Sequence, residues 1–171
     1  MGEILFRTKL SENLFKGLSP WMQKLPGGLI HVNVVGCALF AAISGSSAAT
    51  VATVGKMSIP ELRKRKYPEK ILLGSLAGSG TLGLLIPPSI ILIIYGVAVQ
   101  ESIAKLFIAG IIPGIMIALI FMSYVIIWSL INKKDMPKII EQYSFLEKLK
   151  RSKQLLPVIL LILGVIGSIY T

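Results

Sequence analysis

The residues that could perform chemistry gather in two short uncharged segments. The first is SGSS at 44–47, and the second is GTLGLLIPPS at 80–89. Serine hydroxyls, and backbone carbonyls that a broken helix leaves without an amide donor, can coordinate a cation, while helix N-termini at the same breaks favour an anionic group. Neither segment contains a carboxylate. A site built from them would therefore use neutral oxygens, which suits sodium better than a proton relay.

Each segment also has a purely structural interpretation. Glycine and serine in membrane helices often only permit close packing, and for 44–47 the packing and site interpretations are equally open. The segment 80–89 has two glycines and two prolines. Because a proline inside a helix costs about 3 kcal/mol, packing alone explains this segment poorly, and we favour a site there.

The sequence offers little for enzymatic chemistry. His31 is the single histidine and Cys37 the single cysteine, and no Asp or Glu lies near either of them in the sequence. We find no hydrolase triad, zinc-ligand spacing or phosphate-binding loop. We therefore expect no catalytic residue and no cofactor, and we interpret Cys37 as a small packing residue. Asn33 and Thr50 are expected to pack a hairpin or to form helix hydrogen bonds.

The composition indicates an all-α integral membrane protein. Hydrophobic residues make up 54% of the chain and charged residues 15%, whereas a soluble domain carries about 25% charged residues. A membrane-spanning helix needs roughly 20 apolar residues. Runs without Asp, Glu, Lys or Arg that match or approach this length lie at 25–55, 71–100, 106–132 and 154–171. The net charge of +10 does not indicate a nucleic-acid partner, because the basic residues lie between the apolar runs.

These patterns predict a sequence of helical elements that positions the two segments. They are an amphipathic cytoplasmic helix (1–26), a re-entrant hairpin (27–56), a basic cytoplasmic loop (57–70), a broken transmembrane helix (71–100), a transmembrane helix (103–132), a second amphipathic cytoplasmic helix (136–153) and the truncated start of a further transmembrane helix (154–171). The hairpin would consist of two helices, at about 28–43 and 47–56. Within the basic loop, Ser58 and Pro60 predict the start of a short helix.

The distribution of positive charge favours a hairpin at 27–56 over a membrane-spanning helix. If the basic loop at 57–70 is cytoplasmic and 27–56 enters and leaves on one side, every Lys and Arg except Lys105 lies in the cytoplasm. If 27–56 crossed the membrane instead, four basic residues near the N-terminus would lie outside, contrary to the positive-inside rule.

Three motifs in order resemble a known family. They are LPGGLIHVNVVGCALFAAISGSSAATVATVGKMSIPELRKRKY, then GSGTLGLLIPPSIILIIYG, then SIAKLFIAGIIPG. The strings resemble the large membrane subunit, DctM or M, of tripartite ATP-independent periplasmic (TRAP) transporters. The resemblance covers about residues 17–130 and continues more loosely to the end of the chain.

The resemblance implies one half of an inverted-repeat elevator transporter in a bacterial inner membrane. Such transporters use a sodium gradient, a periplasmic substrate-binding protein and a small membrane subunit to import organic acids, of the C4-dicarboxylate or sialic acid type. By that pattern 27–56 and 71–100 belong to the transport domain, and 1–26 and 136–153 are arm helices. The implied sodium ligands are Ser44, Ser47, Gly83, Ile86 and Pro88, mainly through backbone carbonyls. Adjoining the ion and substrate site would be Gly45, Ser46, Gly80, Thr81, Pro87 and Ser89.

The family also has a second, inverted half with a second hairpin, and the sequence ends before such a half. We therefore expect the chain to be a fragment of a larger permease. Two alternatives stay open at this point. One is a fragment of an ion-coupled anion symporter outside the TRAP family, and the other is a non-transporting membrane scaffold subunit.

Overall fold

The structure is a computed structural model and describes residues 10–137 and 145–170. Every regular element in these residues is helical, which confirms the all-α prediction. The helices are α2 (Leu10–Met22), α3 (Ile30–Ser44), α4 (Ser47–Lys64), α5 (Glu69–Gly80), η1 (Thr81–Leu84), α6 (Ile90–Val99), α7 (Ile103–Ile131), α8 (Phe145–Ser152), η2 (Lys153–Leu155) and α9 (Leu156–Tyr170). Within the described part of the chain, α7 alone is both long and apolar enough to cross a membrane.

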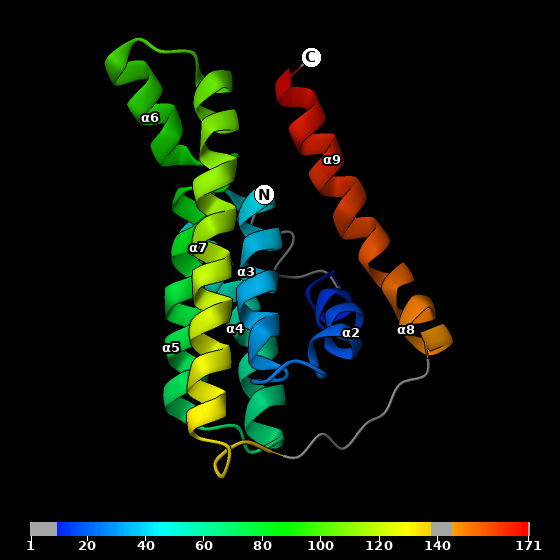
Figure 1. Ribbon diagram of the computed structural model, residues 1–171. Coiled ribbons are helices and arrows are strands. Elements are labelled where there is room, and N and C mark those ends of the chain that lie inside the picture. Colours follow the sequence, from blue (N-terminus) through cyan, green and yellow to red (C-terminus); the bar gives the residue numbers. More distant parts are fainter. Residues whose placement is uncertain (1–9, 138–144, 171) are drawn as a thin grey trace.

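Helices α3 and α4 form an antiparallel hairpin whose tip is a two-residue link (Figure 1). Gly45 ends α3 in the left-handed region (φ 61°), and its amide donates to the carbonyl of Ala41. Ser46 is extended and caps α4, because its hydroxyl accepts a hydrogen bond from the amide of Ala49. Glycine at the end of one helix and serine at the start of the next are the residues that these two positions favour. The chain is interrupted within the segment 44–47, where the sequence predicts a break.

The prediction of a new helix at Ser58 is wrong, and so is the assignment of 57–70 to a loop. Helix α4 continues through Pro60 to Lys64, and a short turn then leads to α5. Pro60 removes one backbone hydrogen bond, but Val54, Ser58 and Leu62 all lie on the buried face of α4. Packing of that face on α3 and α5 holds the helix together across the proline, as tertiary contacts often override local propensity.

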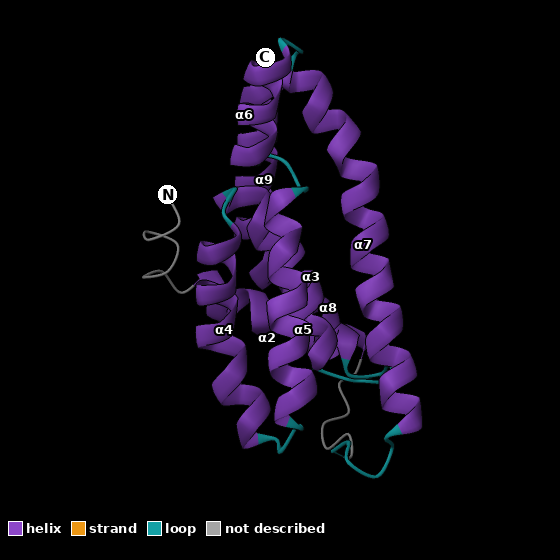
Figure 2. Ribbon diagram, turned by 90° about the vertical axis from the view of Figure 1, so that its left-hand side faces the viewer, coloured by secondary structure: helices purple, strands orange, loops and turns teal. Residues whose placement is uncertain are grey.

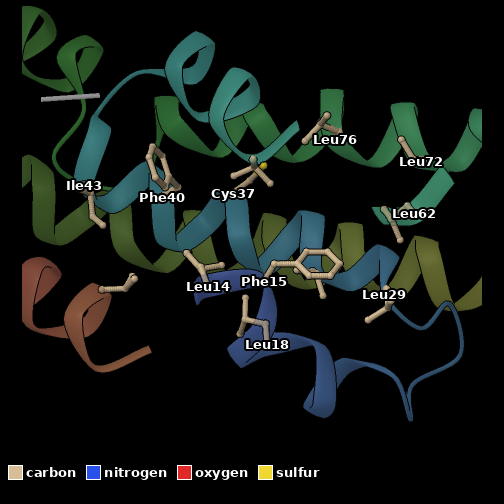
Figure 3. Close-up of a cluster of buried hydrophobic side chains, with 13 residues drawn as sticks. Leu14, Phe15, Leu18, Leu29, Cys37, Phe40, Ile43, Leu62, Leu72 and Leu76 are labelled. Atoms are coloured by element: carbon tan, nitrogen blue, oxygen red, sulfur yellow. The ribbon is translucent and has the colours of Figure 1, made fainter. Parts of the chain in front are cut away.

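The core lies on the two sides of the hairpin, which α2 covers on one side and α5 on the other (Figure 3). Leu14, Phe15 and Leu18 of α2 are almost fully buried and belong to one hydrophobic cluster with residues of the hairpin and α5. The other members of this cluster include Val32, Cys37, Phe40, Val54, Leu62, Leu72 and Leu76. Residues 1–9 of the predicted amphipathic helix (1–26) lie outside the described residues. The described part of α2 packs on the hairpin through one apolar face.

Polar groups also join α3 to α5. The Asn33 side-chain amide donates to the carbonyl of Leu72 (3.2 Å) and to the hydroxyl of Ser75 (3.0 Å). At the base of the hairpin, the Tyr67 hydroxyl accepts the amide of Leu29 (3.1 Å), one of the amides that a helix start leaves unpaired. Asn33 therefore has the packing role that the sequence predicts, and Tyr67 anchors the base.

The segment 71–100, predicted to be a broken transmembrane helix, is interrupted in the structure. Its first part is α5 with η1, its second part is α6, and residues 85–89 between them are not helical. Helix α7 then runs back along the molecule, as Figure 2 shows, and contacts α6, α3 and α5. Close contacts with α7 show which part of that helix lies beside the hairpin base and which part lies beside the break. Gly27 at the hairpin base lies against Val125, and the break lies against Gly110 and Gly114.

The C-terminal helices pack mainly on α2, and α9 also contacts α3. The indole Nε1 of Trp21 donates to the hydroxyl of Ser152 (2.8 Å), and the ammonium of Lys148 lies 5.6 Å from the centre of the Trp21 ring. Gly17 faces Leu155 at close range. The predicted amphipathic helix at 136–153 is described only in part, because residues 138–144 lie outside the described residues.

Candidate ion site at the hairpin tip and the helix break

The tip of the hairpin is stiffened by its own hydroxyl groups. Ser44 Oγ and Thr50 Oγ1 are hydrogen-bonded at 2.8 Å, which ties the end of α3 to the first turn of α4. Ser44 Oγ also lies 3.3 Å from the carbonyl oxygen of Ser46, to which it can donate. The Ser44 hydroxyl is thus engaged within the tip, and it shapes the turn.

Two prolines remove the helical hydrogen bonds that would cross the break. In a continuous helix the carbonyls of Gly83 and Leu84 would accept amides from residues 87 and 88, and both of these are prolines. The hydroxyl of Ser89 replaces one lost donor, because it donates to the Leu84 carbonyl at 2.7 Å. The Gly83 carbonyl loses the donor that a continuous helix would supply, so it remains an oxygen suited to coordinate a cation.

The tip and the break meet through glycines on both sides. A Cβ built on Gly83 would lie 3.0 Å from the backbone nitrogen of Ser47 and 3.1 Å from its Oγ. A Cβ built on Gly45 would lie 2.6 Å from the carbonyl oxygen of Pro88. Gly80 lies against Val51 in the same way. The absence of side chains at these three glycines therefore lets the hairpin tip touch the helix break.

The Ser47 hydroxyl lies at this contact and is available to bind a ligand. Its Oγ is buried and has no hydrogen-bond partner within the described structure. A buried hydroxyl without a partner costs about 1–3 kcal/mol, and such groups often mark the place of a water or an ion. The hydroxyl lies at the N-terminus of α4, directly beside Gly83.

The structure brings some of the predicted site residues together and separates others. Ser47, Gly83, Gly45 and Pro88 converge at the tip and break. Ser44, Ser46 and Ser89 shape the surrounding backbone through hydrogen bonds. Thr81 is exposed and its hydroxyl donates to the Gly78 carbonyl (2.6 Å). Pro87 is buried, and Ile86 directs its side chain onto Gly114, so only its backbone remains available at the break.

Two residues that support this site, Gly110 and Gly114 of α7, are not among the site residues predicted from the sequence. A Cβ on Gly110 would lie 2.7 Å from the carbonyl oxygen of Leu85, and a Cβ on Gly114 would lie 3.0 Å from Cγ1 of Ile86. The two glycines form a G-x-x-x-G pattern, which permits close approach of membrane helices. In the sequence, this G-x-x-x-G pattern is the feature that could have predicted a contact surface on α7.

Other polar groups have structural roles. His31 Nε2 lies 2.7 Å from the carbonyl oxygen of Pro26 at the base of the hairpin. In the part of the chain that the structure describes, no group of three or more His, Cys, Asp or Glu side chains could hold a metal ion.

Comparison with known proteins identifies the family. The family model for the tripartite ATP-independent periplasmic transporter, DctM component, matches residues 1–171. The chain belongs to the DctM family. The match covers both the hairpin tip and the helix break, and it agrees with the resemblance carried by the motifs. It also excludes the alternative of a symporter outside the TRAP family.

Several relatives in this family are permeases for different solutes. The chain is 41% identical over 145 residues to the C4-dicarboxylate TRAP transporter large permease protein DctM of Pseudomonas aeruginosa, covering 85% of this chain and 33% of the relative. It is 42% identical over 114 residues to the sialic acid TRAP transporter permease protein SiaT of Haemophilus influenzae, covering 67% of this chain and 18% of the relative. It is 34% identical over 174 residues to the ectoine/5-hydroxyectoine TRAP transporter large permease protein UehC of Ruegeria pomeroyi, covering 99% of this chain and 40% of the relative.

The chain spans about a third of the length of the large permease proteins that it matches. These relatives are transporter permeases and not enzymes, in agreement with the absence of enzyme motifs in the sequence.

Proposed function

We propose that the chain forms part of the large permease subunit of a sodium-coupled TRAP transporter in a bacterial inner membrane. The transporter imports an organic acid that a periplasmic binding protein delivers, and it works with a small membrane subunit. Family membership supports the permease role. One relative is the isethionate TRAP transporter permease protein DctMQ of Oleidesulfovibrio alaskensis, whose name combines M and Q components.

The observation that carries this proposal is the contact between the hairpin tip and the helix break. Non-helical backbone inside a bilayer is tolerated only where it faces protein or a water-filled cavity. Here Gly83 lies against Ser47. The Ser47 hydroxyl at this contact is buried and has no hydrogen-bond partner within the described residues. Broken helices of this kind form ion and substrate sites in secondary transporters.

The depth of the tip along α7 supports a re-entrant hairpin. The 29 residues of α7 extend over about 43 Å at 1.5 Å per residue, and a bilayer core is about 30 Å thick. The break packs on Gly110 and Gly114, 7 and 11 residues after Ile103, which is about 10–17 Å from that end. If α7 is centred in the bilayer, the tip lies inside the apolar layer, while the hairpin base lies beside Val125, near the other end.

The proposed sodium site combines neutral oxygens from both segments. Ser47 would contribute its hydroxyl, and Gly83, Ile86 and Pro88 their backbone carbonyls. The Ser44 hydroxyl is hydrogen-bonded to Thr50, so Ser44 would act through its backbone or by shaping the tip. This set suits a hard monovalent cation, because it supplies oxygen ligands without a protonatable group.

Sodium-dependent uptake tests the proposal. The full-length permease would be reconstituted in proteoliposomes with its small subunit and binding protein, and uptake of a C4-dicarboxylate and of sialic acid would be measured against sodium concentration. Ser47→Ala should raise the sodium concentration for half-maximal uptake several-fold. Ser123→Ala is the matched control, because the Ser123 hydroxyl is exposed and donates to Leu119 within α7 (2.8 Å).

Three outcomes would contradict parts of the proposal. Uptake that ignores the sodium gradient would remove the coupling assignment. Unchanged sodium dependence in Ser47→Ala would remove the site assignment while leaving the permease role in place. Stable assembly with the other subunits but no solute flux would favour the alternative of a non-transporting scaffold.

A further inference from the structure

The turn between α4 and α5 carries an excess of positive charge that its own carboxylates do not balance. The Arg63 guanidinium pairs with Glu69 through two hydrogen bonds of 2.7 and 3.2 Å, and Arg65 lies 3.6 Å from Glu61. Three further cations are exposed and have no ion pair within the described residues. They are Lys64, Lys66 and Lys70.

The backbone of the turn projects these lysines outward. Lys66 has a φ of 60°, and this left-handed residue reverses the chain after α4. The amide of Tyr67 then donates back to the carbonyl of Leu62 (3.0 Å). Because Tyr67 is anchored at Leu29, the lysines on either side of it are held in a fixed place at the end of the hairpin.

The turn lies at one end of the apolar span. Tyr67 packs in a cluster with Ile30, Ile71, Val125 and Trp128, near the C-terminal end of α7. Figures 1 and 2 show the turn and that end of α7 at the same end of the molecule. Tyrosine and tryptophan favour the boundary between hydrocarbon and headgroups. The three lysines are therefore at headgroup level if α7 spans the bilayer.

An exposed apolar strip on α5 begins one turn beyond Lys70. Leu73, Gly74 and Ala77 are all exposed and lie on the same face of the helix as Lys70. Leu73 is 42% exposed, and a Cβ on Gly74 would meet no atom within 4 Å. The strip is therefore open and shallow, with a cation at the end that faces the headgroups.

We propose that this surface, formed by Lys64, Lys66, Lys70 and the strip from Leu73 to Ala77, binds an anionic phospholipid of the adjacent leaflet. The lysines would contact the headgroup phosphate, and an acyl chain would lie against the strip. Basic clusters at the membrane boundary attract anionic lipids, with about 1 kcal/mol for each Lys or Arg. The proposal requires α7 to span the membrane, and it does not depend on the sodium site.

Native mass spectrometry of the full-length permease tests this surface. The protein would be titrated with dioleoylphosphatidylglycerol and, separately, with zwitterionic dioleoylphosphatidylcholine, and the apparent Kd of each lipid would be determined. We expect tighter binding of phosphatidylglycerol. Replacing Lys64, Lys66 and Lys70 by Gln should weaken it by about fivefold for each lysine, which corresponds to about 1 kcal/mol each. Phosphatidylcholine binding should not change.

Two further variants make the test specific. Lys105→Gln is the single-charge control for Lys70→Gln, because Lys105 is exposed at the opposite end of α7. Gly74→Trp would fill the strip without touching the lysines, and it should weaken binding of the long-chain lipid. Should the triple variant fail to fold, Lys70→Gln and Lys70→Arg still decide the point, since only the first loses the charge.

Three results would overturn the proposal. The first is equal affinity for the two lipids, and the second is an equal loss of affinity in Lys105→Gln and Lys70→Gln. The third is full displacement of phosphatidylglycerol by millimolar glycerol 3-phosphate, which has the anionic group but no acyl chain. The last result would indicate a site for a soluble phosphate ester in place of a lipid.

Discussion

The carbonyl oxygen of Pro88 occupies the space that a side chain on Gly45 would need. The two residues are 43 positions apart in the chain, and a Cβ on Gly45 would lie 2.6 Å from that oxygen. Gly45 also has a φ of 61°, which ordinary residues adopt only with strain. The hairpin tip can therefore rest on the helix break only while residue 45 is glycine.

Gly45→Ala should separate the tip from the break. The left-handed backbone alone costs an alanine about 1–2 kcal/mol, and the Pro88 carbonyl must also move. We expect at least a tenfold loss of sodium-dependent uptake by the full-length permease, with normal membrane insertion. Gly164→Ala, where the new Cβ meets nothing within 4 Å, should retain wild-type uptake. Wild-type uptake by both variants would show that this contact is dispensable.

Pro88→Ala should reduce transport while leaving membrane insertion intact. Alanine restores an amide that can donate to the Leu84 carbonyl, in competition with the hydroxyl of Ser89. The non-helical segment would then shorten, and the carbonyls at the break would change direction. Uptake in proteoliposomes measures the effect. Pro60→Ala is the control, because Pro60 is exposed inside α4 and far along the helix from the tip. Equal uptake by the two variants would exclude a special role for Pro88.

Tyr67 should make the hairpin base sensitive to alkaline pH. Burial raises the pKa of the Tyr67 hydroxyl, and the hydrogen bond from Leu29 and the charge of Arg65 only partly oppose this. The folded state therefore favours the neutral phenol. Its stability is complete below the ordinary tyrosine pKa of about 10 and falls as the pH rises above that value.

Thermal unfolding of the full-length permease between pH 8 and pH 11 tests this prediction, with Tyr67→Phe for comparison. At pH 8 the variant should be about 1 kcal/mol less stable, because the Leu29 amide loses its acceptor. Above pH 10 the difference should shrink, since phenylalanine cannot ionise. Parallel pH profiles for wild type and variant would contradict the assignment.

Gly17→Val should weaken the attachment of the C-terminal helices to α2. A Cβ on Gly17 would lie 2.6 Å from Cγ of Leu155, so the larger side chain forces α2 away from η2. Overpacking of this kind typically costs about 1–3 kcal/mol, and the melting temperature should fall. Gly164→Val is the matched control in α9, because a Cβ there meets nothing within 4 Å. An unchanged melting temperature in Gly17→Val would mean that the contact is not maintained.

Much of the fold follows from local patterns in the sequence. The uncharged run that forms α7 and the two breaks in the helices were all predicted, because glycine, serine and proline act on the backbone within a few residues. The same local rule failed at Pro60, where the buried face of α4 keeps the helix continuous. At the two breaks the interrupted backbone itself makes the packing contacts, so tertiary packing there does not oppose the local preference.

The sequence by itself determined that this is an all-α protein with two interrupted helical segments, because composition and backbone propensity are local properties, and its motifs carried the resemblance to the DctM family. Only the tertiary structure decided that Ser47 contacts Gly83 and that the Ser44 hydroxyl is hydrogen-bonded to Thr50. It also decided that the break packs on Gly110 and Gly114. These contacts join residues brought together by the packing of α3, α4, α5 and α7. Such approaches depend on the combined burial of many side chains, and no short segment encodes them.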